Sequence, residues 1–233
     1  MYHPFSITET LSIAWHILRK NISTIAVYSL LALVIIGSSG FLIYNVLTDD
    51  ILKSIGVIVL LVIISFIFLG FVKLIFQLID KEYYDFEFKD VLPKTKMLIS
   101  YLILLVIVSS VAVLITNVIK MLEDGVLQSL LGIFVFLLIQ FFFLFYFPIC
   151  ACFIVDDGSG PFESVSQSFK LIKGNFLKYF LLFLLIELMV FLGTVTRIGM
   201  IFVIPFVNIL LIVAYRKLIY SHLDVDDDIT ETV

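Results

Sequence analysis

The sequence is poor in charged side chains. Only 15% of its 233 residues are Asp, Glu, Lys or Arg, whereas 62% are hydrophobic and 24 are Phe. Soluble domains are about half apolar, so a water-soluble core does not absorb this much apolar surface. The 15 Lys and Arg residues are scattered and form no basic block, which argues against a nucleic-acid partner. The composition predicts an integral membrane protein with lipid as the solvent of its apolar side chains.

Cysteine and histidine are also scarce. Cys150 and Cys152 point to different sides of a helix, so we expect small buried or lipid-facing residues rather than a metal site or a disulfide. None of the three histidines, His3, His16 and His222, lies in an apolar run, so an intramembrane enzyme would lack a nucleophile–base pair at one depth. There is no nucleophile elbow, Walker loop, zinc motif or paired-carboxylate site. We predict no metal, no cofactor and no enzymatic activity.

Long apolar runs dominate what is present. A bilayer is crossed by about 20 apolar residues in a helix. Six runs reach this length, at about 22–46, 55–79, 97–119, 128–154, 176–195 and 198–219. They predict an all-α integral membrane protein with six transmembrane helices and a single membrane domain over 1–233. The acidic residues at 221–233 are expected to form a disordered cytoplasmic tail.

Two segments have the pattern of amphipathic surface helices. Residues 161–176, PFESVSQSFKLIKGNF, place apolar residues on one face and polar ones opposite: Phe162, Val165, Phe169, Ile172 and Phe176 against Glu163, Gln167, Lys170 and Lys173. Residues 5–20 begin with Ser6 and Glu9 at the spacing of a capping box. Their predicted apolar stripe is Ile7, Leu11, Ala14, Trp15, Leu18 and Ile22. A cleaved signal peptide is the alternative for the first run, but the long amphipathic leader favours an uncleaved span.

An internal repeat connects these segments. Residues 15–22, WHILRKNI, align with 169–176, FKLIKGNF, at an offset of 154 residues. Half that offset falls near Leu92, where a poorer stripe is broken by Pro93. We predict three repeated units, at about 1–79, 80–154 and 155–220, each with a cytoplasmic amphipathic surface helix followed by two spanning helices.

The distribution of basic residues predicts the orientation. With the N-terminus inside, the inner segments hold Arg19, Lys20, Lys73, Lys81, Lys89, Lys94, Lys96, Lys170, Lys173, Lys178, Arg216 and Lys217. The outer side keeps only Lys53, Lys120 and Arg197. Cytoplasmic loops carry such an excess, so we predict an inner-membrane protein with both termini cytoplasmic.

The segment at 161–176, an apolar span after it, and a last span containing Pro205 and ending in Tyr215-Arg216-Lys217 resemble a group of bacterial six-span membrane proteins. This group includes the membrane domain of some glycerophosphodiester phosphodiesterases and the YciC-like proteins of unassigned function. The resemblance implies a bacterial inner-membrane protein with no established activity. The chain departs from the phosphodiesterases because it has no segment resembling their soluble catalytic domain.

One set of polar residues is expected inside the membrane. Glu187, Gln140 and Asn208 are predicted at similar depth in the last three spans. A carboxylate there is costly unless it is protonated or paired. The three side chains form either a polar site that lines a path or hydrogen bonds that join helices.

A second set is expected at the cytoplasmic surface, where anionic lipid headgroups attract basic side chains. The candidate headgroup contacts are Trp15, Arg19, Lys20, Lys170, Lys173 and Lys178. We predict a non-enzymatic scaffold or accessory in envelope or lipid physiology, with the lipid bilayer and a membrane or cytoplasmic protein as partners. The alternative is a small transporter or channel built around Glu187.

Overall fold

The structure, a computed structural model, describes residues 5–80, 88–122, 125–196 and 199–230. Within these ranges every regular element is helical. Six segments are long and apolar enough to cross a membrane: Ile22–Asn45, Asp50–Asp80, Lys89–Lys120, Val126–Asp156, Phe176–Thr196 and Met200–Ser221. The six predicted spans are therefore confirmed, and they indicate a multi-pass membrane protein. Lys81 and Arg197, two residues of the predicted orientation, lie outside the described ranges.

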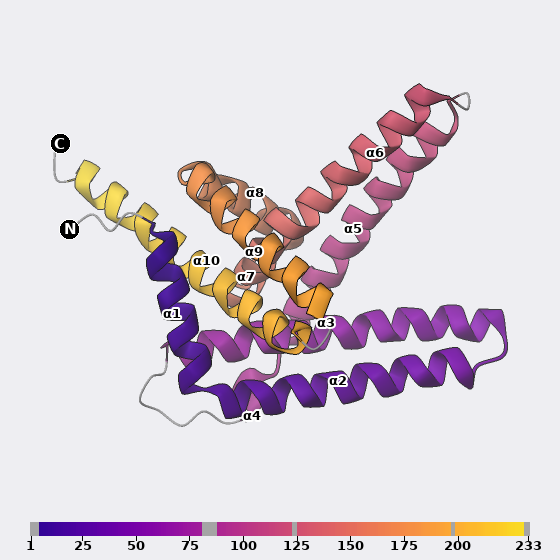
Figure 1. Ribbon diagram of the computed structural model, residues 1–233, viewed down its shortest axis with the longest axis horizontal. Helices are drawn as coiled ribbons and strands as arrows, with labels where there is room; N and C mark the ends of the chain where they lie inside the picture. The colour runs from indigo at the N-terminus through magenta and orange to yellow at the C-terminus, as the bar shows by residue number, and fades with distance from the viewer. Residues whose placement is uncertain (1–4, 81–87, 123–124, 197–198, 231–233) are drawn as a thin grey trace.

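The helices follow one another with short connections. In chain order they are α1 (Ile7–Lys20), α2 (Ile22–Asn45), α3 (Asp50–Asp80), α4 (Phe88–Val91), α5 (Thr95–Lys120), α6 (Val126–Phe141), the π-helical turn η1 (Phe142–Tyr146), α7 (Phe147–Asp156), α8 (Pro161–Lys173), α9 (Phe176–Thr196) and α10 (Met200–Thr230). The apolar helices form three hairpins, α2–α3, α5–α6 with its continuation into α7, and α9–α10 (Figure 1).

The hairpins meet at one end and separate toward the other. Figure 1 shows α2–α3 and α5–α6 diverging from a common region that also holds α1, α7 and α10. We call this region, where α1, α4, α8 and the C-terminal halves of α3, α7 and α10 lie, the closed end. The opposite end, with the C-terminal ends of α2, α5 and α9, is the open end.

The core lies at the closed end. The second helices of the three hairpins, α3, α7 and α10, all pack on one another. Their contact residues are apolar and almost wholly buried, including Leu69, Ile75, Ile149, Ile154 and Ala214. The short helices pack around this core, α1 on α10, α4 on α3 and α8 on α7.

The open end has little core. Among the described residues α6 buries none of its side chains, and α2 buries only Ile25. Spanning helices satisfy their own backbone hydrogen bonds, so their apolar side chains can face lipid without cost. These hairpins therefore present most of their surface to the bilayer or to another apolar partner.

The fourth span contains a π-helical turn just before Pro148. Proline has no N–H, and its ring clashes with the carbonyl four residues earlier, here that of Leu144. The helix widens over Phe142–Tyr146, directly before α7. The buried hydroxyl of Tyr179 on α9 donates to the Phe145 carbonyl within this turn, at 3.0 Å. The irregular turn is thus secured by the neighbouring hairpin.

The capping box predicted at the start of α1 is wrong. Ser6 is the N-cap residue, but its side chain makes no cap hydrogen bond and lies 3.1 Å from the Thr8 hydroxyl. Glu9, the expected second member, instead pairs with Lys217 of α10. The ion pair with another helix removes the carboxylate that the box requires.

The buried faces of the surface helices contain part of the predicted stripes, Ile172 of α8 and Ala14 of α1, together with small polar residues outside them. In α8 the buried residues include Ser164 and Ser168, whereas Phe162 is 72% exposed. In α1 they are Thr10, Ala14 and Ile17. Small side chains allow helices to approach closely, and large apolar ones can face lipid, so in a membrane the apolar stripe need not point at the protein.

The C-terminal segment continues the last span. The backbone of α10 is helical to Thr230, where a disordered acidic tail was expected. Neither Gly nor Pro follows Pro205, so nothing in the sequence stops the helix near residue 221. The predicted tail is therefore helical up to Thr230.

Candidate functional site: an ion-pair cluster at the closed end

Arg216 on α10 is the centre of a polar cluster at the closed end. Its guanidinium donates from Nη1 to Asp156 Oδ2 at 3.0 Å and from Nη2 to Asp80 Oδ2 at 2.6 Å. The two carboxylates are the last residues of α7 and α3. One side chain thus joins all three helices of the core, through charge-assisted hydrogen bonds that are stronger than neutral ones.

An aromatic ring covers one face of this guanidinium. It lies over the ring of Phe76, 4.7 Å from the centroid, in a cation–π contact. Tyr215, fully buried, donates its hydroxyl to Asp156 Oδ2 at 3.1 Å, and its ring packs edge-on against Phe76 and Phe153. The rings exclude water on one side and so strengthen the ion pairs.

The next residue extends the cluster to α1. Lys217 Nζ lies 2.5 Å from Glu9 Oε1. This pair is more exposed than that of Arg216 with Asp156, because the Glu9 side chain is 50% exposed and that of Asp156 only 19%. Exposed pairs contribute little, so we expect Arg216 rather than Lys217 to dominate the energy of the cluster.

Two buried polar atoms at the closed end lack a hydrogen-bond partner among the described residues. Gln77 Oε1, an acceptor, and Arg216 Nε, a donor, are buried and have no hydrogen-bond partner among the described residues. Gln77 is on α3, one turn before Asp80. Buried polar atoms usually have hydrogen-bond partners. These two atoms without partners therefore distinguish this region from the apolar core.

Asp157 lies beside the cluster and carries a perturbed carboxyl group. Burial raises the pKa of Asp157, and the charges of Asp156 and Glu163 raise it further, while Arg216 opposes them. The folded protein therefore holds this proton more tightly than the unfolded chain does. The neutral carboxyl stabilises the fold in acid, and this stabilisation is lost as the pH rises through the raised pKa.

We predict that Asp157→Asn stabilises the protein at neutral pH by less than about 1 kcal/mol, because the side chain is largely exposed. The gain should shrink as the pH falls toward the ordinary pKa of an aspartate, about 3.9. Unfolding midpoints of the two proteins over a pH series measure this. A gain that grows in acid would contradict the assignment.

The predicted intramembrane residues are not bonded to one another in the described structure. Asn208 donates its amide to the Ile204 carbonyl of its own helix at 2.8 Å. Glu187 on α9 is half-buried and Gln140 on α6 is exposed, and no hydrogen bond joins any two of the three described side chains. Their shared role in a polar site stays a prediction.

The predicted headgroup contacts all lie on exposed positions near the closed end. Trp15, Arg19 and Lys20 are on α1, Lys170 and Lys173 on the last turn of α8, and Lys178 on the first turn of α9. Trp15 packs edge-on against Phe206 of α10, with ring centroids 6.1 Å apart. Their exposure leaves them accessible to headgroups.

The cysteines lie in the core as small buried residues. Cys150 and Cys152 are both free, and Cys150 Sγ is 3.3 Å from the hydroxyl of Ser168, which donates to it from α8. Over the described residues no three His, Cys, Asp or Glu side chains gather as metal ligands would.

The sequence analysis did not predict the ion-pair cluster around Arg216. Its partners are 136 and 60 residues away, so no local spacing reveals them. The available signal was positional, because Asp80 and Asp156 each end an apolar run and Arg216 lies near the same end of the last one.

Comparison with known proteins adds no relative to this picture: no family model, curated protein or solved structure matches the chain.

Proposed function

We propose that the chain is a multi-pass inner-membrane protein that acts as a non-enzymatic scaffold or accessory in envelope or lipid physiology. The observation that carries this proposal is the contrast between its two ends. Arg216 ties three helices together at the closed end, whereas the described part of the chain leaves the apolar sides of the hairpins uncovered toward the open end. Such a molecule is built to hold lipid or partner helices around a fixed base.

The charges support a cytoplasmic closed end. Of the basic residues that the structure describes, only Lys53 and Lys120 lie at the open end. Basic residues are concentrated on the cytoplasmic side of membrane proteins. The start of α1 and the end of α10 both lie at the closed end, so both termini would be cytoplasmic (Figure 1).

The buried positions support the repeat of units one and three. An offset of 154 residues relates Thr10, Ala14 and Ile17, the buried residues of α1, to Ser164, Ser168 and Leu171 of α8, which are also buried. The same offset relates Ile25 of α2 to Tyr179 of α9, again both buried. Equivalent positions therefore meet equivalent environments.

The packing order supports the middle unit as well. Each short helix packs on the second spanning helix of the unit before it: α8 on α7, α4 on α3 and, closing the circle, α1 on α10. Three units arranged in a ring would pack in this way. The short α4 (Phe88–Val91), followed by Pro93, would be the reduced surface helix of the second unit.

In such a ring, Asp80, Asp156 and Arg216 occupy matching places near the closed ends of α3, α7 and α10. Three identical charges at that place would repel one another, and one arginine between two aspartates removes this repulsion. We therefore propose that the cluster holds the three units in register, so that the hairpins diverge from a rigid base.

Photocrosslinking in native membranes tests the scaffold. A photoreactive phenylalanine analogue is placed at Phe134 of α6 or Phe162 of α8, both exposed, with the buried Phe145 position as control. We expect a protein adduct of defined mass from at least one exposed position and none from Phe145. Lipid adducts alone, at every position, would contradict a scaffold.

The transporter remains the rival because Glu187 is half-buried in a span and has no hydrogen-bond or ion-pair partner among the described residues. Intramembrane acids often mark proton or ion paths. Purified protein in proteoliposomes should show no proton leak above empty vesicles. A leak that Glu187→Gln abolishes would replace the scaffold with the transporter.

A further inference from the structure

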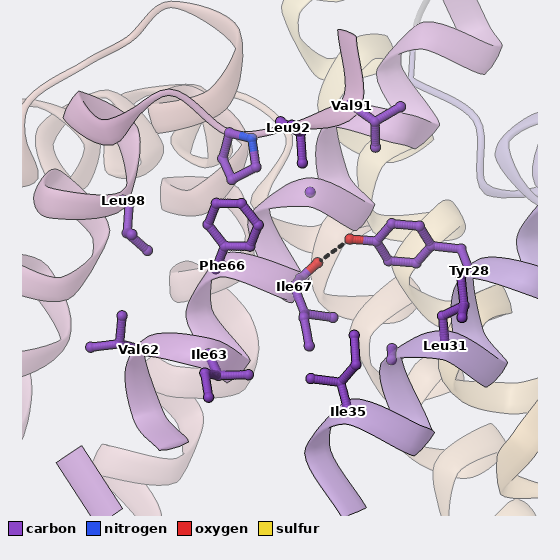
Figure 2. Close-up of a pocket in the computed structure, with 13 residues that line it drawn as sticks. Tyr28, Leu31, Ile35, Val62, Ile63, Phe66, Ile67, Val91, Leu92 and Leu98 are labelled. Carbon is purple, nitrogen blue, oxygen red and sulfur yellow. Dashed lines mark hydrogen bonds between the residues drawn. The ribbon is translucent and has the colours of Figure 1, made fainter. Parts of the chain in front are cut away.

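A groove of about 330 Å³ opens between α2, α3 and the start of α5, beside the closed end. Figure 2 shows Tyr28, Leu31 and Ile35 of α2 on one side and Val62, Ile63 and Phe66 of α3 on the other. Leu98 of α5 and the segment Val91–Pro93 complete the wall. Its volume lies at the lower end of the range for small-molecule sites, about 300–1,000 Å³.

The groove is lined by apolar groups. Among the described residues that line it, the one polar side-chain group is the Tyr28 hydroxyl, which donates to the Ile67 carbonyl at 2.7 Å (Figure 2). Gly70 makes this contact possible, because a Cβ there would lie 2.5 Å from the Tyr28 oxygen. Leu31, Ile35 and Phe66 are exposed on the outer side, so the groove opens laterally toward the bilayer.

The segment Val91–Pro93 forms one side of the groove, which we call its roof. Positive charge lies beside this roof. Lys73, one turn beyond Gly70 on α3, donates from Nζ to the carbonyl of Leu92, a roof residue, at 2.8 Å. Lys94 directly follows the roof residue Pro93, is exposed, and lies near enough to Lys73 for the two charges to interact. Asp90 supplies one opposing carboxylate nearby. Among the described charges that act on one another here, two ammonium groups, those of Lys73 and Lys94, are opposed by the one carboxylate of Asp90.

We propose that this groove binds one acyl chain of an anionic phospholipid, with the phosphate at Lys73 and Lys94. The apolar walls match a hydrocarbon chain, and the lateral opening gives access from the bilayer. The Lys73 ammonium keeps two donors after its bond to Leu92, and an ammonium is a common phosphate ligand. The site deepens the proposed function and rests on it only in taking the closed end as the lipid-headgroup side.

Tryptophan fluorescence provides the test. The chain has a single Trp, so Trp15→Phe creates a silent background. Phe66→Trp then reports from the groove, and Val34→Trp, exposed on α2 outside the groove, reports ordinary lipid contact. Leu98→Trp is a second groove reporter if Phe66→Trp does not give a monodisperse protein. Each variant is reconstituted in phosphatidylcholine vesicles that contain a rising fraction of one brominated lipid. This lipid is either phosphatidylglycerol or phosphatidylcholine, and its brominated acyl chains quench Trp fluorescence.

We expect brominated phosphatidylglycerol to quench the groove reporter half-maximally at a several-fold lower mole fraction than brominated phosphatidylcholine. Val34→Trp should not distinguish the two lipids. Adding Lys94→Gln to the groove reporter should reduce its preference for phosphatidylglycerol about fivefold, because one basic group at an anionic surface contributes about that much. Lys120→Gln, which removes the same charge from the exposed end of α5 at the open end, should leave it unchanged.

If both lipids quench the groove reporter and the Val34→Trp reporter equally, the site is overturned. A preference for phosphatidylglycerol that survives Lys73→Gln and Lys94→Gln together would also overturn it. Inorganic phosphate at equal concentration should not compete, because the acyl chain is part of the ligand. Competition by phosphate alone would reduce the site to an anion contact and overturn the acyl-chain proposal. Protein adducts in the photocrosslinking experiment are independent of all these outcomes, so the scaffold and the lipid site can fail separately.

Discussion

Arg216→Gln is expected to lower the free energy of unfolding by about 3 kcal/mol. The side chain is only 20% exposed and holds two carboxylates, so its loss leaves Asp156 largely buried without a cationic partner. Asp156→Asn should cost a similar amount, since it replaces the charged acceptor of both Arg216 and Tyr215 with a neutral amide. Asp80→Asn should cost less than about 1 kcal/mol, because Asp80 is 47% exposed. Equilibrium unfolding in mixed micelles measures all three.

The matched control for this prediction is Lys217→Gln, which removes the adjacent cation and its exposed pair with Glu9. It should cost no more than about 1 kcal/mol. The double variant Arg216→Gln/Asp156→Asn should cost clearly less than the sum of its parts, since both remove the same interaction. If Arg216→Gln is no worse than Lys217→Gln, the cluster does not hold the core together.

The second large effect is expected from overpacking two equivalent positions. Ala14→Phe on α1 and Ser168→Phe on α8 place a ring where the native side chains are fully buried against α10 and α7. Each should destabilise by about 1–3 kcal/mol or prevent folding, because a packed interface has no room for the added atoms. Similar losses at both positions would support the proposed repeat.

Controls for this pair exist at the same offset. His16 and Lys170 are exposed on α1 and α8, and His16→Phe and Lys170→Phe should each change stability by about 0.5 kcal/mol or less. Thermal unfolding in detergent compares the four variants. A loss at Ser168 with none at Ala14 would mean that α1 does not pack as α8 does.

The spans were predictable because each is a local property. About 20 apolar residues in sequence are enough to identify a membrane helix, and no distant contact is needed. The turn at 156–161 also depends on local residues, because Gly158 adopts a φ of 69° and Pro161 begins α8. These features follow from residues that lie next to one another.

The faces of the surface helices were not predictable in the same way. The apolar stripe of α8 contains Phe162 and Phe169, both exposed, while Ser164 and Ser168 pack against α7. The periodicity identifies an apolar stripe, but it does not say whether protein or lipid covers that stripe. Beside a bilayer, lipid accepts the phenylalanines and the small serines allow close helix contact.

The cluster was beyond sequence reasoning for another reason. Arg216, Asp80 and Asp156 come from three hairpins, and their meeting depends on how these hairpins pack. Glu9 shows the same limit, because a local capping role was plausible until its partner Lys217 on α10 was known. Polar residues at the ends of spans need the packing order before their partners can be named.

The most direct test of this account measures the two ends of the molecule in lipid nanodiscs. Spin labels at Thr8 on α1 and Tyr220 on α10 report the closed end, and labels at Thr48, after α2, and Met121, after α5, report the open end; all four positions are exposed. The native cysteines are buried and should not react with the label. We expect electron–electron distance measurements to give a short, narrow distribution at the closed end and a clearly longer distance at the open end. An open-end distance as short as the closed-end one would mean that the hairpins form a parallel bundle, and would contradict the account.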